Sequence, residues 1–90
     1  MEFSERCIQT LEKEGFLNIS EQSRGSLTGT QSFPAAATPT ALIVTDGSLT
    51  VTFAATLHSL YVGDRLDIPP AVPYSITAGP TGYQLILGEN

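Results

Sequence analysis

The stretch from Gly63 to Tyr74, GDRLDIPPAVPY, decides how the chain folds. Gly63 and Asp64 predict a tight turn, because glycine adopts left-handed backbone angles and a following aspartate caps turns through its side chain. A short strand over 65–68 follows, and Pro69-Pro70 ends it because proline has no N–H to donate to a sheet. The segment therefore predicts a turn, a strand and a stiff second turn, which is typical of an antiparallel β protein.

The spacing of this segment closely resembles the second conserved motif of the cupin superfamily. That motif runs glycine, five residues, proline, one residue, glycine, two residues, histidine, three residues and asparagine. Gly63 and Pro69 occupy the first two places. Ala71 stands where the second glycine is usual, Tyr74 where the histidine is, and Ala78 where the asparagine is. The resemblance implies a barrel of two packed sheets, open at one end, and frequent homodimers.

The first cupin motif is matched only in its spacing and final glycine, and not in its metal ligands. Gly47 fits its last glycine, and counting back places Thr40 where a glutamate is usual. The motif's histidine pair then falls within FPAA, residues 33–36, and no His, Asp, Glu or Cys occurs from residue 25 to residue 45. Iron, manganese or zinc needs three or four imidazoles, carboxylates or thiolates, and hydroxyls or alanines do not replace them. We therefore expect no metal ligands and no cofactor.

Outward from this segment, the chain predicts one short helix followed only by strands. Residues 4–14 favour a helix, in which Cys7, Ile8 and Leu11 form an apolar stripe that we expect to dock on the barrel wall. Asp46-Gly47 lies between two apolar runs and predicts a hairpin. We expect a single all-β domain over 1–90: a cupin-type, jelly-roll-like antiparallel β-barrel over about 16–88 after the helix. The segments that favour strands are 16–20, 26–32, 41–45, 49–53, 57–62, 65–68, 73–77 and 83–87.

Charge and composition exclude several classes of partner. The 90 residues hold 4 Lys and Arg against 9 Asp and Glu, for a net charge of −5, and the basic residues are scattered along the chain. Nucleic acids need clustered cations and anionic membranes repel this charge, so we expect neither as a partner. No apolar run approaches the roughly 18 residues that span a bilayer. A charged N-terminal segment, MEFSERCIQT, and a single cysteine predict a cytoplasmic protein.

A pocket inside the barrel is the remaining place for a function. We expect it to be largely apolar, with hydroxyl groups from a threonine and one or two tyrosines. Tyr74 should point into the barrel mouth, because it stands in the place of the metal-binding histidine. A 90-residue domain also needs these side chains as core, and a packed core is the slightly better interpretation. The candidate pocket residues are Phe33, Ala35, Thr40, Leu42, Tyr74, Ile76 and Tyr83.

Three functions stay open at this stage. The leading hypothesis is a metal-free, non-enzymatic module that binds a small molecule or acts in regulation, as a homodimer with residues 16–20 as the docked edge. The alternative is a metal-independent sugar isomerase or epimerase, with Tyr74 as its acid. The sequence offers no convincing general base to pair with Tyr74. His58 is the lone histidine and is best interpreted as structural. No catalytic residue is therefore assigned. The third is a structural or interaction protein with a solid barrel.

Overall fold

The computed structural model describes residues 3–25 and 29–89. Within them the chain forms one helix and six strands, all of which pair antiparallel in one sheet. Residues 26–28, which belong to a predicted strand, lie outside the described residues. The all-β architecture with an N-terminal helix is confirmed. The elements are α1 (Phe3–Lys13), β1 (Asn18–Arg24), β2 (Thr30–Phe33), β3 (Thr40–Phe53), β4 (Thr56–Tyr61), β5 (Arg65–Ile68) and β6 (Tyr74–Glu89).

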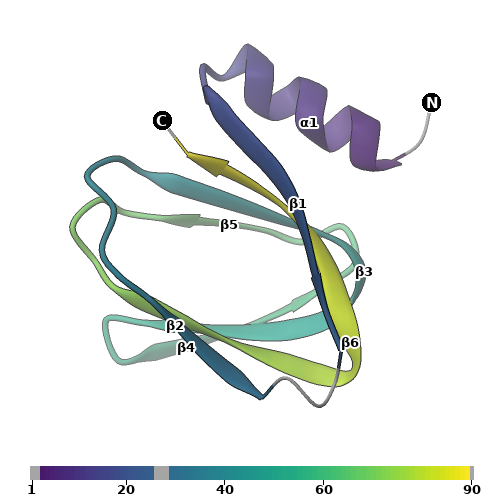
Figure 1. The fold of residues 1–90 in the computed structure, drawn as a ribbon, viewed down its shortest axis with the longest axis vertical. Helices are drawn as coiled ribbons and strands as arrows, with labels where there is room; N and C mark the ends of the chain where they lie inside the picture. Colours follow the sequence, from purple (N-terminus) through teal and green to yellow (C-terminus); the bar gives the residue numbers. More distant parts are fainter. Residues whose placement is uncertain (1–2, 26–28, 90) are drawn as a thin grey trace.

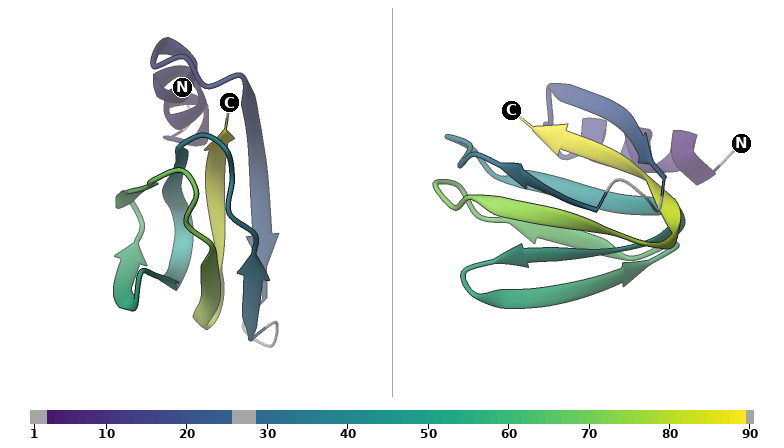
Figure 2. Two further views of the ribbon diagram at one scale, coloured as in Figure 1. Left: turned by 90° about the vertical axis from the view of Figure 1, so that its left-hand side faces the viewer. Right: turned by 60° about the horizontal axis from the view of Figure 1, so that its bottom comes forward.

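Two long, bent strands, β3 and β6, hold the sheet together (Figure 1). The first arm of β3 pairs with β5 and with the second arm of β6, which also pairs with β1. The second arm of β3 pairs with β4 and with the first arm of β6, which also pairs with β2. The sheet therefore folds over into two layers that meet at the bend, and its edges do not close into a ring (Figure 2).

We call these the helix-covered layer (β1, β5, the second arm of β6 and the first arm of β3) and the bare layer (β2, β4 and the other two arms). The helix α1 lies against the outer face of the helix-covered layer (Figure 1). No helix within the described residues is long and apolar enough to cross a membrane.

The predicted hairpin at Asp46-Gly47 is wrong. These residues lie inside β3, where the register to β6 shifts on either side of them, and Gly47 has a φ of 69°. A left-handed glycine permits a β-bulge as well as a hairpin, so the dipeptide alone does not distinguish the two. A Cβ on Gly47 would collide with the backbone of Gly82, which also has a positive φ, of 81°. The glycines let β3 and β6 bend together, so the strands predicted separately over 41–45 and 49–53, and over 73–77 and 83–87, are continuous.

The hairpin between β3 and β4 instead turns at Ala54 and Ala55. Phe53 pairs with Thr56 across this two-residue turn, and both alanines have positive φ angles, 51° and 62°. A type I′ turn requires positive φ at both central residues and prefers asparagine and glycine there. The sequence carried no sign of this turn because alanine is not a turn-forming residue.

Ala71 supports the alignment of the second cupin motif. Its φ is 65°, and its N–H donates a hydrogen bond to the carbonyl oxygen of Ala36 at 2.8 Å. Glycine adopts this left-handed conformation without steric cost, which gives a physical reason for glycine being usual at this place in the motif.

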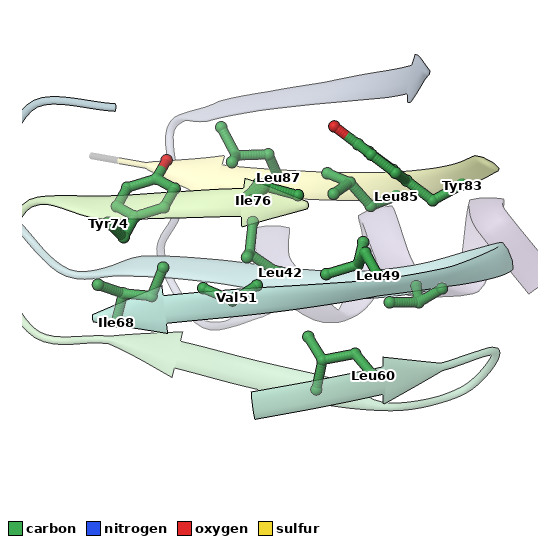
Figure 3. Close-up of a cluster of buried hydrophobic side chains, with 11 residues drawn as sticks. Leu42, Leu49, Val51, Leu60, Ile68, Tyr74, Ile76, Tyr83, Leu85 and Leu87 are labelled. Atoms are coloured by element: carbon green, nitrogen blue, oxygen red, sulfur yellow. The ribbon is translucent and has the colours of Figure 1, made fainter. Parts of the chain in front are cut away.

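Two apolar clusters lie on opposite faces of the sheet. The smaller lies outside the helix-covered layer, where Cys7 and Leu11 of α1 pack on Ala41, Ile43 and Ile86. The predicted docking of the helix stripe on the wall is thus confirmed. The larger fills the space between the layers (Figure 3) and consists of Leu42, Val44, Leu49, Val51, Leu60, Ile68, Tyr74, Ile76, Tyr83, Leu85 and Leu87.

Candidate ligand-binding rim

One rim of the larger core opens into a hollow of about 230 Å³, which we call the rim hollow. Tyr74 begins β6 and Glu89 ends it, so the bend of this strand brings residues 15 positions apart to one rim. The last residue of β2 and the segment after it supply the remaining wall, which is apolar. The lining residues are Phe33, Pro34, Ala35, Ala36, Tyr74 and Glu89.

Tyr74 closes the core at this rim. Its side chain is only 8% exposed and belongs to the larger core, so it points inward as expected for the residue in the histidine place. Figure 3 shows Tyr74 and Tyr83 at opposite ends of the cluster. The Tyr74 ring stacks on Phe33, its partner across β2 and β6, with centroids 4.9 Å apart and planes 12° apart. Within the described residues its hydroxyl makes no hydrogen bond, to Thr40 or to any other group.

The two core tyrosines remain neutral phenols at physiological pH. Burial raises the pKa of Tyr74, and the negative charge of Glu89 raises it further. The pKa of Tyr83 is also raised, because the effect of burial is larger than the opposing effect of the positive charge of Arg24. A neutral Tyr74 can donate or accept a hydrogen bond at the rim hollow. Glu89 is the one carboxylate among the lining residues.

The structure brings three of the seven candidate pocket residues to the rim hollow: Phe33, Ala35 and Tyr74. Leu42 and Ile76 are core side chains between the layers, and Thr40 is a buried polar residue that is 1% exposed. Tyr83 lies at the other end of the core.

Sequence reasoning missed Glu89. Its signal was the alternation in β6, where Tyr83, Leu85 and Leu87 all belong to the inner cluster. Residues two apart in a strand share a face, so the pattern extended by one step places Glu89 on the inner face at the strand end.

A larger hollow of about 390 Å³ lies at the bend beside Tyr83 and has a polar lining that includes Arg24 and Asp46. Its wall ends at Gly25, next to residues 26–28.

The residues present do not fit the metal centre that cupins commonly hold. Among residues 3–25 and 29–89, no three His, Cys, Asp or Glu side chains lie close enough to hold an ion. In the motif alignment Tyr74 and Thr40 stand where two of the usual ligands are expected, and a neutral phenol and a hydroxyl are poor ligands for iron, manganese or zinc.

The other metal-ligating residue types have structural roles or lie elsewhere. His58 stacks on Phe53 with ring centroids 4.9 Å apart, and Cys7 of α1 is buried against the opposite face of the sheet. Asp64 accepts the backbone N–H of Tyr61 at 2.9 Å, as its turn position predicted.

Comparison with known proteins finds structural likeness alone. No family model matches the sequence, and no curated protein matches it. A cupin-2 domain protein from Shewanella frigidimarina superposes with a TM-score of 0.67 at 21% identity, covering 79% of this chain and 67% of that one. The Drosophila melanogaster CENP-C cupin domain gives 0.62 at 22% identity (82% and 59%), and a structure of that protein bound to CAL1 is also similar. Hydroxypropylphosphonic acid epoxidase from S. wedmorenis gives 0.65 at 17% identity, covering 80% of this chain and 41% of the enzyme.

Proposed function

We propose that this chain, which has the cupin fold, is a metal-free, non-enzymatic module that binds a small molecule at the rim hollow. The observation that carries this proposal is Tyr74, a phenol with no hydrogen-bond partner among the described residues, facing a hollow with apolar walls. A small apolar hollow with a few polar groups is the usual form of a ligand site. At about 230 Å³ it suits a ligand of few heavy atoms.

A matched pair of substitutions tests the location of binding. Ala35 and Ala37 are both exposed, but only Ala35 lines the rim hollow. We expect Ala35→Leu to fill the hollow and abolish the chemical-shift changes that small fragments cause at Phe33 and Tyr74 in NMR spectra. Ala37→Leu should leave them intact. Fragments that bind elsewhere, or that bind Ala35→Leu as well as the wild type, would refute the site.

The metal-free part of the proposal has its own test. Elemental analysis of tag-free protein should find no stoichiometric iron, manganese, nickel or zinc, and added metal should leave the melting temperature unchanged, because an ion that binds only the native state would raise it. About one metal per chain would contradict the proposal.

The rival isomerase or epimerase gains a base from Glu89, which sequence reasoning did not provide. Proton transfer needs an acid and a base beside the substrate, and Tyr74 and Glu89 line the same hollow. Binding remains the better proposal, because the raised pKa of Tyr74 makes it a weaker acid. Turnover of an aldose or ketose that is lost in both Tyr74→Phe and Glu89→Gln would favour the enzyme.

The interaction function is favoured by a different feature, the free edge of β4. Eleven buried side chains fill the space between the layers, as the solid-barrel hypothesis expects. Edge strands usually carry charges, prolines or bulges that prevent pairing with another chain. The six residues of β4 include no proline and no Asp, Glu, Lys or Arg. Leu57 and Tyr61 on its outward side are 70% and 62% exposed.

We propose that the chain forms a homodimer through antiparallel pairing of two β4 edges. A two-fold axis at Ser59 would place Leu57 of each copy opposite Tyr61 of the other, a favourable cross-strand pair. The other edges suit this less well. β1 carries Glu21 and Arg24, β5 carries Arg65 and Asp67, and β2 has only four residues before a proline. The residues 16–20 predicted as the docked edge include the first three residues of β1.

Light scattering tests the dimer and its edge together. A six-residue edge buries less than the roughly 800 Å² per partner of a standard interface, so we expect a reversible dimer at tens of micromolar. Ser59→Lys on β4 should give a monomer, and Ser20→Lys on the free edge of β1 should leave the dimer unchanged. A monomeric wild type would overturn the dimer, and a monomer from Ser20→Lys alone would move it to β1. A cytoplasmic location stays a prediction of the sequence.

A further inference from the structure

The rim hollow carries one ionisable carboxylate and no cationic side chain. Glu89 lines it, and neither lysine, arginine nor histidine is among its six lining residues. Within the described residues the side chain of Glu89 has no hydrogen bond or ion pair. By contrast, Glu14 and Asp67 are both held by Arg65. A partly buried carboxylate that lacks a protein partner favours a cation from solution, because burial weakens the screening of its charge by water.

The walls of the rim hollow suit the carbon atoms of an organic cation. Phe33 and Tyr74 stack as a pair of aromatic rings beside Pro34 and two alanines. The electron-rich face of an aromatic ring attracts ammonium groups and does so more strongly where water is excluded. A hydrated inorganic cation would gain little from these apolar walls, and an anion would be repelled by Glu89 and by a chain with a net charge of −5.

We infer that the rim hollow selects a small organic cation, a protonated or quaternary amine with a short apolar body. The ammonium group lies at Glu89 and beside the aromatic pair, and the apolar body lies against Ala35 and Ala36. The phenol of Tyr74 is available to accept an N–H from a protonated amine. This inference rests on the proposed small-molecule site and adds the charge and class of its ligand.

The test uses three probes of similar shape and different charge: benzylammonium, benzyl alcohol and benzoate. NMR titration at low ionic strength should show benzylammonium binding about tenfold tighter than benzyl alcohol, the size expected for a partly desolvated cation site. Benzoate should bind most weakly. The shifts should centre on Phe33, Ala35 and Tyr74, and the preference for the cation should weaken as salt is added.

A charge-matched pair of variants separates a local effect from the net charge of the protein. Glu89→Gln should remove the preference for benzylammonium while the affinity for benzyl alcohol stays the same. Glu21→Gln makes the same change in net charge on an exposed residue of β1 and should keep the preference. Equal binding of the charged and neutral probes at the hollow would overturn the cation inference and leave the proposed site standing. If none of the three probes changes the NMR shifts of the residues that line the hollow, the cation inference is also overturned. The Ala35→Leu fragment comparison would then decide whether the proposed site exists.

Discussion

In the helix-covered layer, the outward side chains of β3 and β6 include Ala41, Ile43 and Ile86, and α1 covers them. In the bare layer, the outward side chains of the same two strands include Thr50 and Thr77, which remain partly exposed. The sequence of each arm reflects this difference. Residues 40–44 are buried without interruption, whereas residues 49–52 alternate between buried and partly exposed. An unbroken apolar run thus indicates a strand covered on both faces, and alternation indicates a strand with one face in water.

Substitution of one leucine on each outer face should give the largest contrast. Leu11 of α1 is fully buried against the sheet, and Leu57 on β4 is 70% exposed. Leu11→Ala should lower the free energy of unfolding by about 2–5 kcal/mol, because it leaves a cavity in the smaller core. Leu57→Ala should change it by less than about 0.5 kcal/mol in the monomer. Chemical denaturation measures both, and equal losses would mean that the helix does not protect its layer.

The bend between the layers should give the next largest effect. Gly47 and Gly63 both have positive φ angles, but a Cβ on Gly63 meets open space and one on Gly47 meets the backbone of Gly82. Gly63→Ala should cost about 1–2 kcal/mol, the cost of a left-handed alanine. Gly47→Ala should cost roughly 1–3 kcal/mol more, because two backbones must separate. Equal costs in the denaturation curves would show that the bend does not need this close approach.

The β4 hairpin of the bare layer offers a smaller gain in stability. Ala55 has a φ of 62°, so Ala55→Gly removes strain while adding freedom to the unfolded chain. We expect a net stabilisation of about 0.5–1 kcal/mol, because the strain relieved exceeds the entropy gained by the unfolded state. The control, Ala37→Gly, lies in an exposed segment with no positive φ and should be slightly destabilising. A loss of stability in Ala55→Gly would contradict the assigned turn.

The ion pair at the edge of the helix-covered layer should give the smallest effect. Both nitrogens of the Arg65 fork donate to Glu14, each at 2.6 Å, and these hydrogen bonds lower the pKa of Glu14. A lowered acid pKa stabilises the fold above the unfolded-state value, near 4.5, and this stabilisation is lost as the pH falls through the folded-state pKa.

Melting temperatures of Glu14→Gln and the wild type should therefore differ slightly at pH 7 and converge as the pH falls through the folded-state pKa of Glu14. Glu12→Gln, an exposed glutamate in the last turn of α1, just before Glu14, should parallel the wild type. A difference between Glu14→Gln and the wild type that grows in acid would reverse the assigned role of the pair.

The candidate site was only partly predictable from the sequence, because one of its residues comes from the far end of a bent strand. Motif spacing placed Tyr74 on the interior, and its partner Phe33 and nearby Ala35 came from the same alignment. Glu89 joins them because β6 bends and returns its far end to the same rim. That bend depends on glycines that contact one another across strands, which a linear pattern does not reveal.

The sequence by itself determined the antiparallel class, the docked helix, the turn at Gly63-Asp64 and the inward position of Tyr74. These follow from hydrophobic period, turn chemistry and spacing, which act over a few neighbouring residues. Only the tertiary structure decided that Asp46-Gly47 is a bend within one strand and that Ala54-Ala55 is the true hairpin turn. The physical reason is that a left-handed residue serves a bulge or a turn equally well, and pairing with distant strands selects between them.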